Sequence, residues 1–375
     1  MSDEELSAQQ MRTTPDEENS SLLTTHYSLG EASDTAIVIL NWNGAAFLRQ
    51  FLPGVLAAAD GARVLVADNA STDDSLTLLA QQFPQVETLV HRENLGFCEG
   101  YNQALSQLQG RFRYYVLLNS DVAVSPGWLL PLRQLLQANP HIAAVQPKVL
   151  AYADPSYFEY AGAGGGYLDR LAYPFCRGRL FDTLERDEGQ YDDDRPVAWA
   201  SGACLLIRAD AWHLAGGLEP AFFAHMEEID LCWRLWNAGH EVWYCGSSAV
   251  QHVGGGTLPK TNPRKTYLNF RNGLALLYKN AAPGELLGPM LQRLLLDGVA
   301  GLRFLLSGEF ANFRAVLRAH FSFYSRFGYW QKRRRAARPH LRITERPGVY
   351  QGSVVWAYFG RRTRSFRDLK MGRTD

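Results

Sequence analysis

Residues 114–122 read Tyr-Tyr-Val-Leu-Leu-Asn-Ser-Asp-Val, and this stretch decides the fold class. A short run of apolar and aromatic residues is typical of a strand that is buried on both faces of an α/β sheet. Polar residues follow at once and end in Asp121. A carboxylate just past such a strand projects into the crevice where open α/β sheets bind ligands, and its oxygens suit a divalent cation. A helix cap is the other common use of an aspartate at this position.

The same pattern recurs on the N-terminal side of this stretch. Apolar segments at 36–40, 63–67 and 86–91 alternate with amphipathic segments that start near residues 44, 72, 96 and 126. Short apolar runs that alternate with helical periodicity indicate βαβ units. The sequence therefore predicts an α/β fold in which helices flank a doubly wound, mostly parallel sheet.

Short polar side chains follow the predicted strands. Asn41 comes directly after the first strand, and Asp68 after the second. Such residues commonly cap the next helix, but Asp68 precedes the capping position and lies at the sheet edge where a base or ribose would bind. A turn-forming role for Asp68 is the competing interpretation. The glycine turn at Asn94 and Gly96 opens another predicted helix, whose N-terminus suits a phosphate or ribose.

An acidic segment opens a helix that is predicted to end near Gly239. Glu227, Glu228 and Asp230 lie in its first turn. Acids there interact favourably with the helix dipole, which is the simplest explanation for them. Helical spacing also places Glu228 on the same face as Cys232, toward the core. A partly buried carboxylate holds its proton more tightly, as a general base for a hydroxyl group must.

A strand-like segment at 243–245 leads to His252. A lone histidine near a strand end is often a structural residue. A neutral imidazole at this position would nevertheless complete a coordination shell that Asp121 begins. Both interpretations stay open on the sequence alone.

Charge divides the chain into segments although its formal net charge is zero. Residues 1–34 carry eight acids and one arginine and are predicted to be disordered. Residues 35–256 hold the α/β pattern, which glycines and acids interrupt at 160–197, and this interruption predicts a mobile loop or an exposed insertion. Helical patterns fill residues 257–330. Residues 331–375 form a basic tail with thirteen Lys or Arg, three acids and interleaved aromatic residues.

The basic tail favours an anionic membrane surface over nucleic acid, because aromatic residues are spaced among its charges. A merely solvated basic face is the competing interpretation. The chain shows no signal-peptide pattern, and its five cysteines lack Cys-x-x-Cys spacing. We therefore expect a cytoplasmic protein that lies peripherally at the inner face of the cytoplasmic membrane.

The helical segment at 284–307 carries too many charges for a membrane span. One of its sides is rich in leucine, and Arg293 and Asp297 lie on the other. The leucines of this side are Leu287, Leu291, Leu294, Leu295, Leu302 and Leu305. We expect them to pack on the rest of the protein, with a position in the membrane interface as the second choice.

Taken together and in this order, the motifs resemble glycosyltransferase family 2, an inverting family with the GT-A fold, and most closely its rhamnosyltransferase-like branch. The resemblance covers about residues 35–256. Its motifs are Asn41-Trp42-Asn43-Gly44, Asp68-Asn69-Ala70-Ser71, Asn94-Leu95-Gly96-Phe97, Asn119-Ser120-Asp121, Ser201-Gly202-Ala203-Cys204 and Glu227-Glu228-Ile229-Asp230-Leu231. Each motif is short, but the whole set in this order is specific.

The resemblance implies an enzyme that moves a sugar, expected to be rhamnose, from a nucleotide-diphospho-sugar to a hydroxyl of a lipid-linked polysaccharide or another glycan. A UDP-hexose or UDP-N-acetylhexosamine donor is the alternative, and a non-catalytic nucleotide-sugar-binding protein is a remote one. The implied cofactor is Mg²⁺ or Mn²⁺, held by Asp121 and His252. The implied base is Glu228, with Glu227 and Asp230 beside it. The implied nucleotide-sugar site consists of Asn41, Asn43, Asp68, Asn94, Gly96, Asn102, Asn119, Trp199, Ser201 and Gly202.

Two positions depart from the family pattern. Asn119 stands where the Asp-x-Asp motif of the family has its first acid, which leaves Asp121 as the carboxylate of that motif. Glu227-Glu228 stands where the family usually has Glu-Asp, so the second acid is one methylene group longer. We therefore expect the cation to need His252 or the phosphates of the donor as further ligands.

Overall fold

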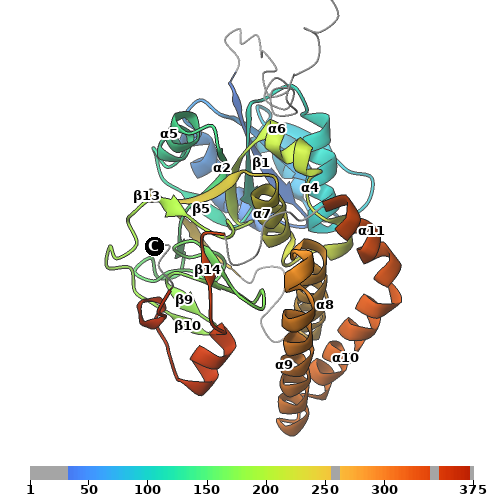
Figure 1. Cartoon of the computed structure of the whole chain (residues 1–375). Coiled ribbons are helices and arrows are strands. Elements are labelled where there is room, and N and C mark those ends of the chain that lie inside the picture. The colour runs from blue at the N-terminus through green and yellow to red at the C-terminus, as the bar shows by residue number, and fades with distance from the viewer. Residues whose placement is uncertain (1–32, 255–261, 338–345, 372–375) are drawn as a thin grey trace, which may run out of the picture. The chain divides into compact units, whose positions relative to one another are not determined.

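A mixed sheet lies at the centre of the part of the chain that the computed structural model describes, namely residues 33–254, 262–337 and 346–371 (Figure 1). Eight of its nine strands follow the order β11-β13-β6-β12-β4-β1-β2-β3, and the ninth, β5, pairs with β13. The strands are β1 (Thr35–Asn41), β2 (Arg63–Asp68), β3 (Glu87–Val90), β4 (Tyr114–Asn119), β5 (Val122–Val124), β6 (Ile142–Ala151), β11 (Arg195–Pro196), β12 (Cys204–Arg208) and β13 (Glu241–His252). The segment 1–34, predicted to be disordered, lies almost wholly outside the described residues.

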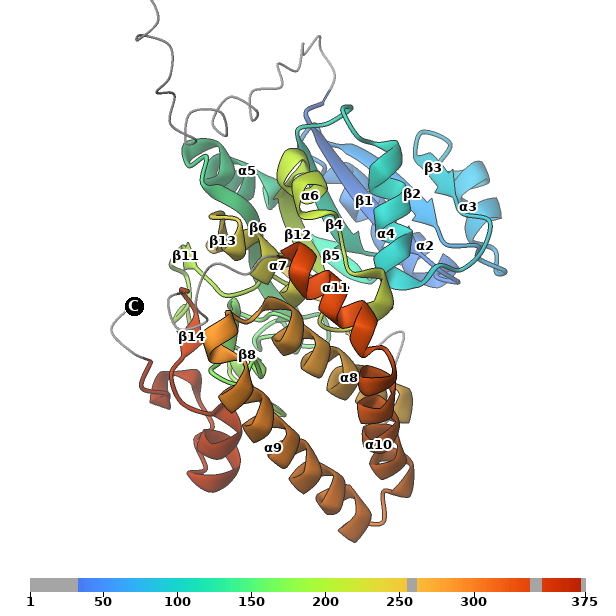
Figure 2. The same cartoon turned by 45° about the vertical axis from the view of Figure 1, so that its right-hand side comes forward.

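Helices cover both faces of this sheet (Figures 1 and 2). They are α2 (Ala45–Ala57), α3 (Ser75–Gln82), α4 (Gly96–Gln107), α5 (Leu129–Ala138), α6 (Ala209–Ala215) and α7 (Glu227–Asn237), and the 3-10 turn η2 (Pro220–Phe222) precedes α7. The helix starts predicted near residues 44, 72, 96 and 126 agree with α2 to α5 within three residues.

The half of the sheet formed by β4, β1, β2 and β3 has the predicted parallel order. Ala36 and Val38 of β1 pack in one core cluster with α4 and α7, whereas Ile37 and Ile39 pack in the other with α2, α3 and α5. The strand is apolar from Ala36 to Leu40 because both of its faces are covered. The α/β prediction is thereby confirmed. Beyond β4 the sheet is mixed, because β12 runs antiparallel to both β4 and β6.

Residues 160–197 contain a second, small sheet where the sequence predicts a loop. Its strands are β7 (Gly166–Asp169), β8 (Pro174–Cys176), β9 (Arg179–Leu180) and β10 (Thr183–Leu184), and β14 (Val349–Tyr350) joins beside β7. The loop prediction is wrong for these strands. Each of β7 to β10 is only two to four residues long, so none is long enough to leave an alternating pattern in the sequence.

Helices dominate the C-terminal part of the chain, as predicted. They are α8 (Pro263–Asn280), α9 (Leu287–Leu306), α10 (Phe310–Ser325) and α11 (Phe327–Ala337), with the short turns η3 (Pro283–Glu285), η5 (Trp356–Gly360) and η6 (Phe366–Asp368). The boundary predicted between residues 330 and 331 falls inside α11, so the basic tail begins as a helix. Within the described ranges, no helix combines the length and the apolar character needed to cross a bilayer.

The orientation predicted for α9 is wrong. Arg293 and Asp297 are buried, whereas Leu287, Leu291, Leu295, Leu302 and Leu305 are exposed. Of the six leucines, Leu294 is the one that packs against the core as predicted. Polar contacts explain this rotation: Arg293 donates to the Leu171 carbonyl at 3.1 Å, and the Tyr173 hydroxyl donates to Asp297 at 3.0 Å. These contacts to the small sheet turn the apolar side of α9 outward, against its amphipathic pattern.

Candidate active site

The carboxyl ends of several strands meet at one edge of the large sheet. β1, β2 and β4 are parallel, and β13 is parallel to β6. Because β12 is antiparallel to both β4 and β6, β13 ends at the same edge as β4. Asn41, Asp68, Asn119 and His252 are the last residues of β1, β2, β4 and β13. Open α/β sheets bind ligands at this edge, so the structure brings four predicted site residues together where a ligand is expected.

Asp121 and His252 face each other at this edge. Asp121 Oδ1 lies 3.2 Å from His252 Nε2, and the Val253 N–H donates to the Asp121 carbonyl. The pairing of β13 with β5 sets this approach, because His252 lies opposite Val122. A carboxylate oxygen and an imidazole nitrogen are suitable ligand types for a divalent cation. The structure thus places the two predicted metal ligands side by side.

A third side chain, Glu159, lies on the other side of His252. Glu159 Oε2 is 3.3 Å from His252 Nδ1, and both residues are buried. Burial disfavours a charged imidazole, but the hydrogen bonds and charges of Asp121 and Glu159 outweigh it and raise the pKa of His252 to about 10. Burial also opposes ionisation of Glu159, yet His252 lowers the pKa of this carboxyl. Glu159 lies between regular elements, so no sequence pattern indicated it.

Asn119 lies next to this pair. Its Nδ2 is 3.5 Å from His252 Nε2, and its backbone N–H donates to the Ala203 carbonyl. An amide adds no negative charge to the edge. Among the residues that the structure describes, no group of three or more His, Cys, Asp or Glu is arranged to hold a metal ion. Asp121 and His252 therefore form a pair of potential ligands.

Glu228 reaches the same edge from the start of α7. Gly202 precedes Ala203, whose carbonyl accepts a hydrogen bond from the Asn119 N–H at the end of β4. A Cβ built on Gly202 would lie 3.7 Å from Glu228 Cβ. The buried Oε2 atoms of Glu227 and Glu228 have no hydrogen-bond partner within the described chain. Burial raises the pKa of Glu228 to about 7, although backbone N–H groups at the helix start lower it. Burial first, and the charge of Glu228 second, raise the pKa of Glu227 well above its usual range.

The loop that leads into α7 has an unusual backbone. Phe223, His225 and Met226 have positive φ angles of 68°, 69° and 71°, which residues other than glycine rarely adopt. The Ala224 N–H donates to the Phe222 carbonyl at 2.8 Å and closes a tight turn around Phe223. Strained backbone of this kind persists only where the surroundings hold it, and it clusters at functional sites.

Two buried residues of α8 hold this loop. Asn272 Nδ2 donates to the carbonyls of Phe222, Ala224 and His225 at 3.1, 3.0 and 2.7 Å. Arg271 Nη2 donates to the Phe222 carbonyl as well, at 2.9 Å. The sequence pattern indicated only a helix at these positions, so Asn272 and Arg271 were not among the predicted site residues.

Gly96 packs against the same loop. It has a φ of 75°, and a Cβ at this position would lie 2.6 Å from the Phe223 ring. The Phe97 N–H donates to the Phe223 carbonyl, so the protein itself caps the first turn of α4. The phosphate or ribose expected at this helix N-terminus is therefore replaced by the α7 loop. Asn94 remains exposed nearby, and its Oδ1 accepts from Asn69 Nδ2 at 3.0 Å.

Asp68 is fully buried and holds the turn after β2. Its Oδ1 accepts from the Ser71 N–H at 2.8 Å, and its Oδ2 accepts from Asn41 Nδ2 at 2.9 Å. The geometry thus favours the turn-forming interpretation of Asp68. Asn43 lies on the exposed side of this turn, where its Oδ1 accepts from the Thr72 N–H at 2.7 Å.

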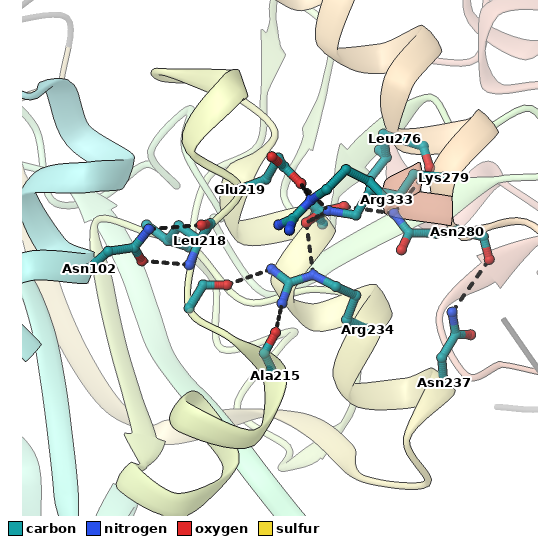
Figure 3. A network of polar contacts seen from close by, with 12 residues as sticks. Asn102, Ala215, Leu218, Glu219, Arg234, Asn237, Leu276, Lys279, Asn280 and Arg333 are labelled. Atoms are coloured by element: carbon teal, nitrogen blue, oxygen red, sulfur yellow. Dashed lines mark hydrogen bonds and ion pairs between the residues drawn. The ribbon is translucent and has the colours of Figure 1, made fainter. Parts of the chain in front are cut away.

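Asp230 belongs to a buried network of ion pairs that joins α7 to α8 and α11 (Figure 3). Its carboxylate lies 2.7 Å from Lys279 Nζ and 2.9 Å from Arg234 Nε. Lys279 also pairs with Glu219, which in turn binds Arg333. Burial favours protonation, but the charges of Lys279 and Arg234 outweigh it and lower the pKa of Asp230 to about 2. The catalytic role predicted for Asp230 is therefore corrected to a structural one, because its carboxylate is fully engaged.

Trp199 and Ser201 support the site from the core. The Trp199 indole N–H donates to the Tyr167 carbonyl at 2.9 Å, and the Ser201 hydroxyl donates to the Ala161 carbonyl at 2.7 Å. Both side chains are buried. We therefore assign them to packing rather than to direct contact with a nucleotide-sugar, whereas Gly202 of the same segment lies beside Glu228 of α7.

Asn102 also has a structural contact. Its amide nitrogen donates to the Leu218 carbonyl at 2.9 Å, and its amide oxygen accepts from the Leu218 N–H at 2.8 Å (Figure 3). This pair of bonds joins α4 to the loop before η2. We therefore separate Asn102 from the predicted nucleotide contacts.

The strand order, the polar residues at the carboxyl edge of the sheet and the acids at the start of α7 are those of glycosyltransferases with a GT-A-like fold. A crystal structure of GalNAc-T7 with UDP, GalNAc and Mn²⁺ is similar in fold, with a TM-score of 0.51 and 13% identity, over 67% of this chain and 49% of that chain. The model of the family described as "Glycosyl transferase family 2" matches residues 36–187.

Two relatives narrow the classification of the chain. The N-acetylglucosaminyl-diphospho-decaprenol L-rhamnosyltransferase of Mycobacterium tuberculosis is 30% identical over 233 residues, which are 58% of this chain and 75% of the relative. The rhamnosyltransferase WbbL of Escherichia coli is 24% identical over 223 residues, which are 56% of this chain and 79% of that protein. The chain therefore belongs to glycosyltransferase family 2, in its rhamnosyltransferase-like branch, and the predicted GT-A-like fold is confirmed.

Proposed function

We propose that this glycosyltransferase inverts the anomeric configuration of the sugar it transfers, with Glu228 as the catalytic base. The observation that carries the proposal is the meeting of two groups at one sheet edge. One is the Asp121–His252 pair, and the other is the unpartnered Oε2 of Glu228, whose pKa is about 7. A base with a pKa near the working pH is the most effective one for removing a hydroxyl proton.

In the proposed reaction, the acceptor oxygen attacks the anomeric carbon from the face opposite the diphosphate. The new carbon–oxygen bond forms as the bond to the diphosphate oxygen breaks, and the electron pair of that bond leaves with the nucleoside diphosphate. Glu228 accepts the hydroxyl proton at Oε2. Burial and the charge of Glu228 raise the pKa of Glu227, so Glu227 holds its proton more tightly than an ordinary carboxyl does. A single displacement of this kind inverts the configuration.

Asp121 and His252 fit a divalent cation by ligand type and by their proximity, and we propose Mg²⁺ or Mn²⁺. Because the pKa of His252 is raised, binding of the cation would have to displace the proton from Nε2. When bound, such an ion would neutralise the charge of the departing diphosphate. Glu159 contacts His252 Nδ1 and thereby directs Nε2 toward Asp121, as acids behind metal-binding histidines commonly do. The exposed side chains of Asn43 and Asn94 are the proposed contacts to the nucleotide.

The relatives support a choice of donor and acceptor. The name of the mycobacterial relative describes transfer of L-rhamnose to a diphospho-decaprenol-linked N-acetylglucosamine, and the Escherichia coli relative is a rhamnosyltransferase. We propose that this chain uses dTDP-rhamnose and a lipid-linked glycan acceptor. We further propose that the chain acts at the inner face of the cytoplasmic membrane and lies there peripherally. A UDP-hexose or UDP-N-acetylhexosamine donor is the alternative that an experiment must separate.

The test measures donor binding and sugar transfer in the same set of variants. The full-length protein is incubated with dTDP-, UDP- and GDP-sugars, Mn²⁺ or Mg²⁺, and a short-chain lipid-diphosphate-linked N-acetylglucosamine. Thermal unfolding reports donor binding, and chromatography of the products reports transfer. We expect dTDP-rhamnose to stabilise the wild type and to be consumed.

The variants separate the proposed roles. Glu228→Gln is expected to bind the donor and to lose transfer, and Asp121→Asn to bind the donor more weakly. Asp60→Asn is the matched control, because Asp60 is exposed at the opposite edge of the sheet. A preference for a UDP-sugar would replace the proposed donor, and unchanged transfer by Glu228→Gln would remove the proposed base. Indifference to every nucleotide-sugar would contradict the catalytic proposal.

A further inference from the structure

The α9 helix presents an apolar face to solvent. Its exposed residues recur every three or four positions, and Leu287, Leu295 and Leu306 are 73%, 70% and 79% exposed. The complete α9 face is Leu287, Leu291, Leu295, Val299, Leu302, Leu305 and Leu306. A stripe of this length is unusual on a soluble surface, and large exposed apolar patches mark interaction sites.

Specific polar contacts keep this face outward. Arg293 and Asp297, on the opposite side of α9, are buried. The Arg293 guanidinium lies over the Tyr173 ring at 3.8 Å and donates to the Ala172 carbonyl, and Asp297 lies 3.3 Å from His320 of α10. Turning the leucines inward would bury fewer charges but would break all of these contacts. The contacts of Arg293 and Asp297 therefore keep the leucines on the outer side of α9.

The neighbouring elements extend the apolar surface. α10 packs beside α9 and exposes Phe310, Leu317, Phe321 and Tyr324. The turn η5 exposes Trp356 and Phe359, and Arg303 of α9 lies over the Phe359 ring at 5.4 Å, which places η5 against α9. We call these residues of α9, α10 and η5 together the apolar face. Aromatic side chains at the edge of such a surface suit the interface between lipid and water.

Positive charge borders the apolar face. A cleft of about 510 Å³ lies between the start of α8 and α10, and Arg264, Arg314 and Arg318 line it together with Tyr267. Between residues 301 and 337 the chain has eight Lys or Arg and a single acid, Glu309. Guanidinium groups bind phosphate oxygens through paired hydrogen bonds, so this cleft is complementary to phosphate groups.

We propose that the apolar face docks on a bilayer that contains anionic phospholipids, and that the Arg264–Arg314–Arg318 cleft takes phosphate groups of that surface. The proposal deepens the proposed function, because it rests on a lipid-linked acceptor. Leucines and aromatic rings would enter the acyl boundary while the arginines bind the headgroups. Arg264 lies over the Phe223 ring at 4.8 Å, so the cleft adjoins the loop that presents Glu228. Docking would thus bring lipid phosphates next to the catalytic helix.

Flotation with lipid vesicles tests the proposal. The full-length protein is mixed with phosphatidylcholine vesicles or with vesicles that contain phosphatidylglycerol, and bound protein is measured at low and high salt. We expect binding to the anionic vesicles that weakens as salt screens the arginines. The double variant Leu291→Glu/Leu295→Glu and the single variant Phe321→Glu should each bind at least about tenfold less, since each places charge in the apolar boundary.

Further variants separate the two parts of the surface. Arg314→Glu/Arg318→Glu should lose the preference for phosphatidylglycerol. Leu214→Glu is the matched control, because Leu214 is 67% exposed on α6, outside the apolar face, and it should bind as the wild type does. Thermal stabilisation by the donor should be unchanged in every variant, which separates failure of docking from failure of the proposed function.

Two results would overturn the docking proposal. Equal vesicle binding by the wild type and both glutamate variants would show that the apolar face does not meet the bilayer. The other result comes from analytical ultracentrifugation without lipid. If the wild type self-associates and Leu291→Glu/Leu295→Glu abolishes this association, the apolar face joins two copies of the chain instead.

Discussion

Replacing Asn272 by leucine should disable catalysis without removing donor binding. Asn272 is fully buried on α8, and its single amide nitrogen donates to three carbonyls of the strained loop before α7. Leucine keeps a similar volume but donates no hydrogen bond. The Phe222 carbonyl would keep Arg271 as a donor, whereas the carbonyls of Ala224 and His225 would lose the Asn272 amide.

The structure sets the size of the effect. The amide nitrogen has two hydrogens for its three acceptors, and Asn272 Oδ1 accepts a further bond from Arg271 Nε at 2.8 Å. At about 1 kcal/mol net for a typical buried hydrogen bond, the loss of these bonds corresponds to about 3 kcal/mol of unfolding free energy. Relaxation of the positive-φ residues would shift the start of α7, and a shift of about 1 Å at reacting groups lowers turnover about 100-fold. We therefore expect kcat to fall about 100-fold while donor affinity changes only a few-fold.

The assay compares Asn272→Leu with Asn237→Leu as a matched control. Asn237 is also buried, but its amide makes one long bond, 3.4 Å, to the Asn280 carbonyl. Thermal unfolding, donor binding and the pH profile of kcat/KM are measured for both. In Asn272→Leu the pKa in the profile should move from that of Glu228 toward an ordinary carboxyl value, a change that lost stability alone would not cause. Wild-type kcat and an unchanged pH profile in a folded Asn272→Leu protein would refute the reasoning.

The remaining predictions concern the acids and the glycine turn. Burial raises the pKa of Glu228 to about 7 in the folded protein. Because the deprotonated carboxylate is the proposed base, kcat/KM should rise with pH and level off above about pH 7. A flat pH profile on both sides of this pKa would contradict the role. Asp230→Asn should lower the free energy of unfolding by about 3 kcal/mol in chemical denaturation, since it leaves the buried Lys279 with less compensation, while each folded molecule keeps its activity. Gly96→Ala should lower both thermal stability and kcat, because its Cβ would meet the Phe223 ring at 2.6 Å; wild-type values for both would show that the loop adapts.

Local patterns account for the part of the fold that the sequence predicted. β1, β2 and β4 are largely apolar because both of their faces are covered, and their ends carry short polar turn residues, so each left a recognisable signal. The small sheet left none, because strands of two to four residues are shorter than the pattern that identifies a strand. Glu159 was missed for the same reason, since it lies beside these short elements.

Long-range contacts decided the roles of the acids. Glu228 and Asp230 are two residues apart in one helical turn and look alike in the sequence. Asp230 meets Lys279, which is 49 residues away along the chain, and its pKa falls to about 2, whereas the buried Oε2 of Glu228 meets no partner in the described chain and its pKa rises to about 7. A pKa depends on burial and neighbouring charge, and neither can be read from adjacent residues.

The orientation of α9 follows the same rule. Its amphipathic pattern correctly predicted a helix, but the contacts of Arg293 and Asp297 with the small sheet turned the leucines outward. Local periodicity and turn chemistry were enough to predict the α/β order, the motif residues and the family. Which acid keeps a carboxylate oxygen without a partner, and which side of α9 faces outward, depend instead on residues that are distant in the sequence and meet only on folding.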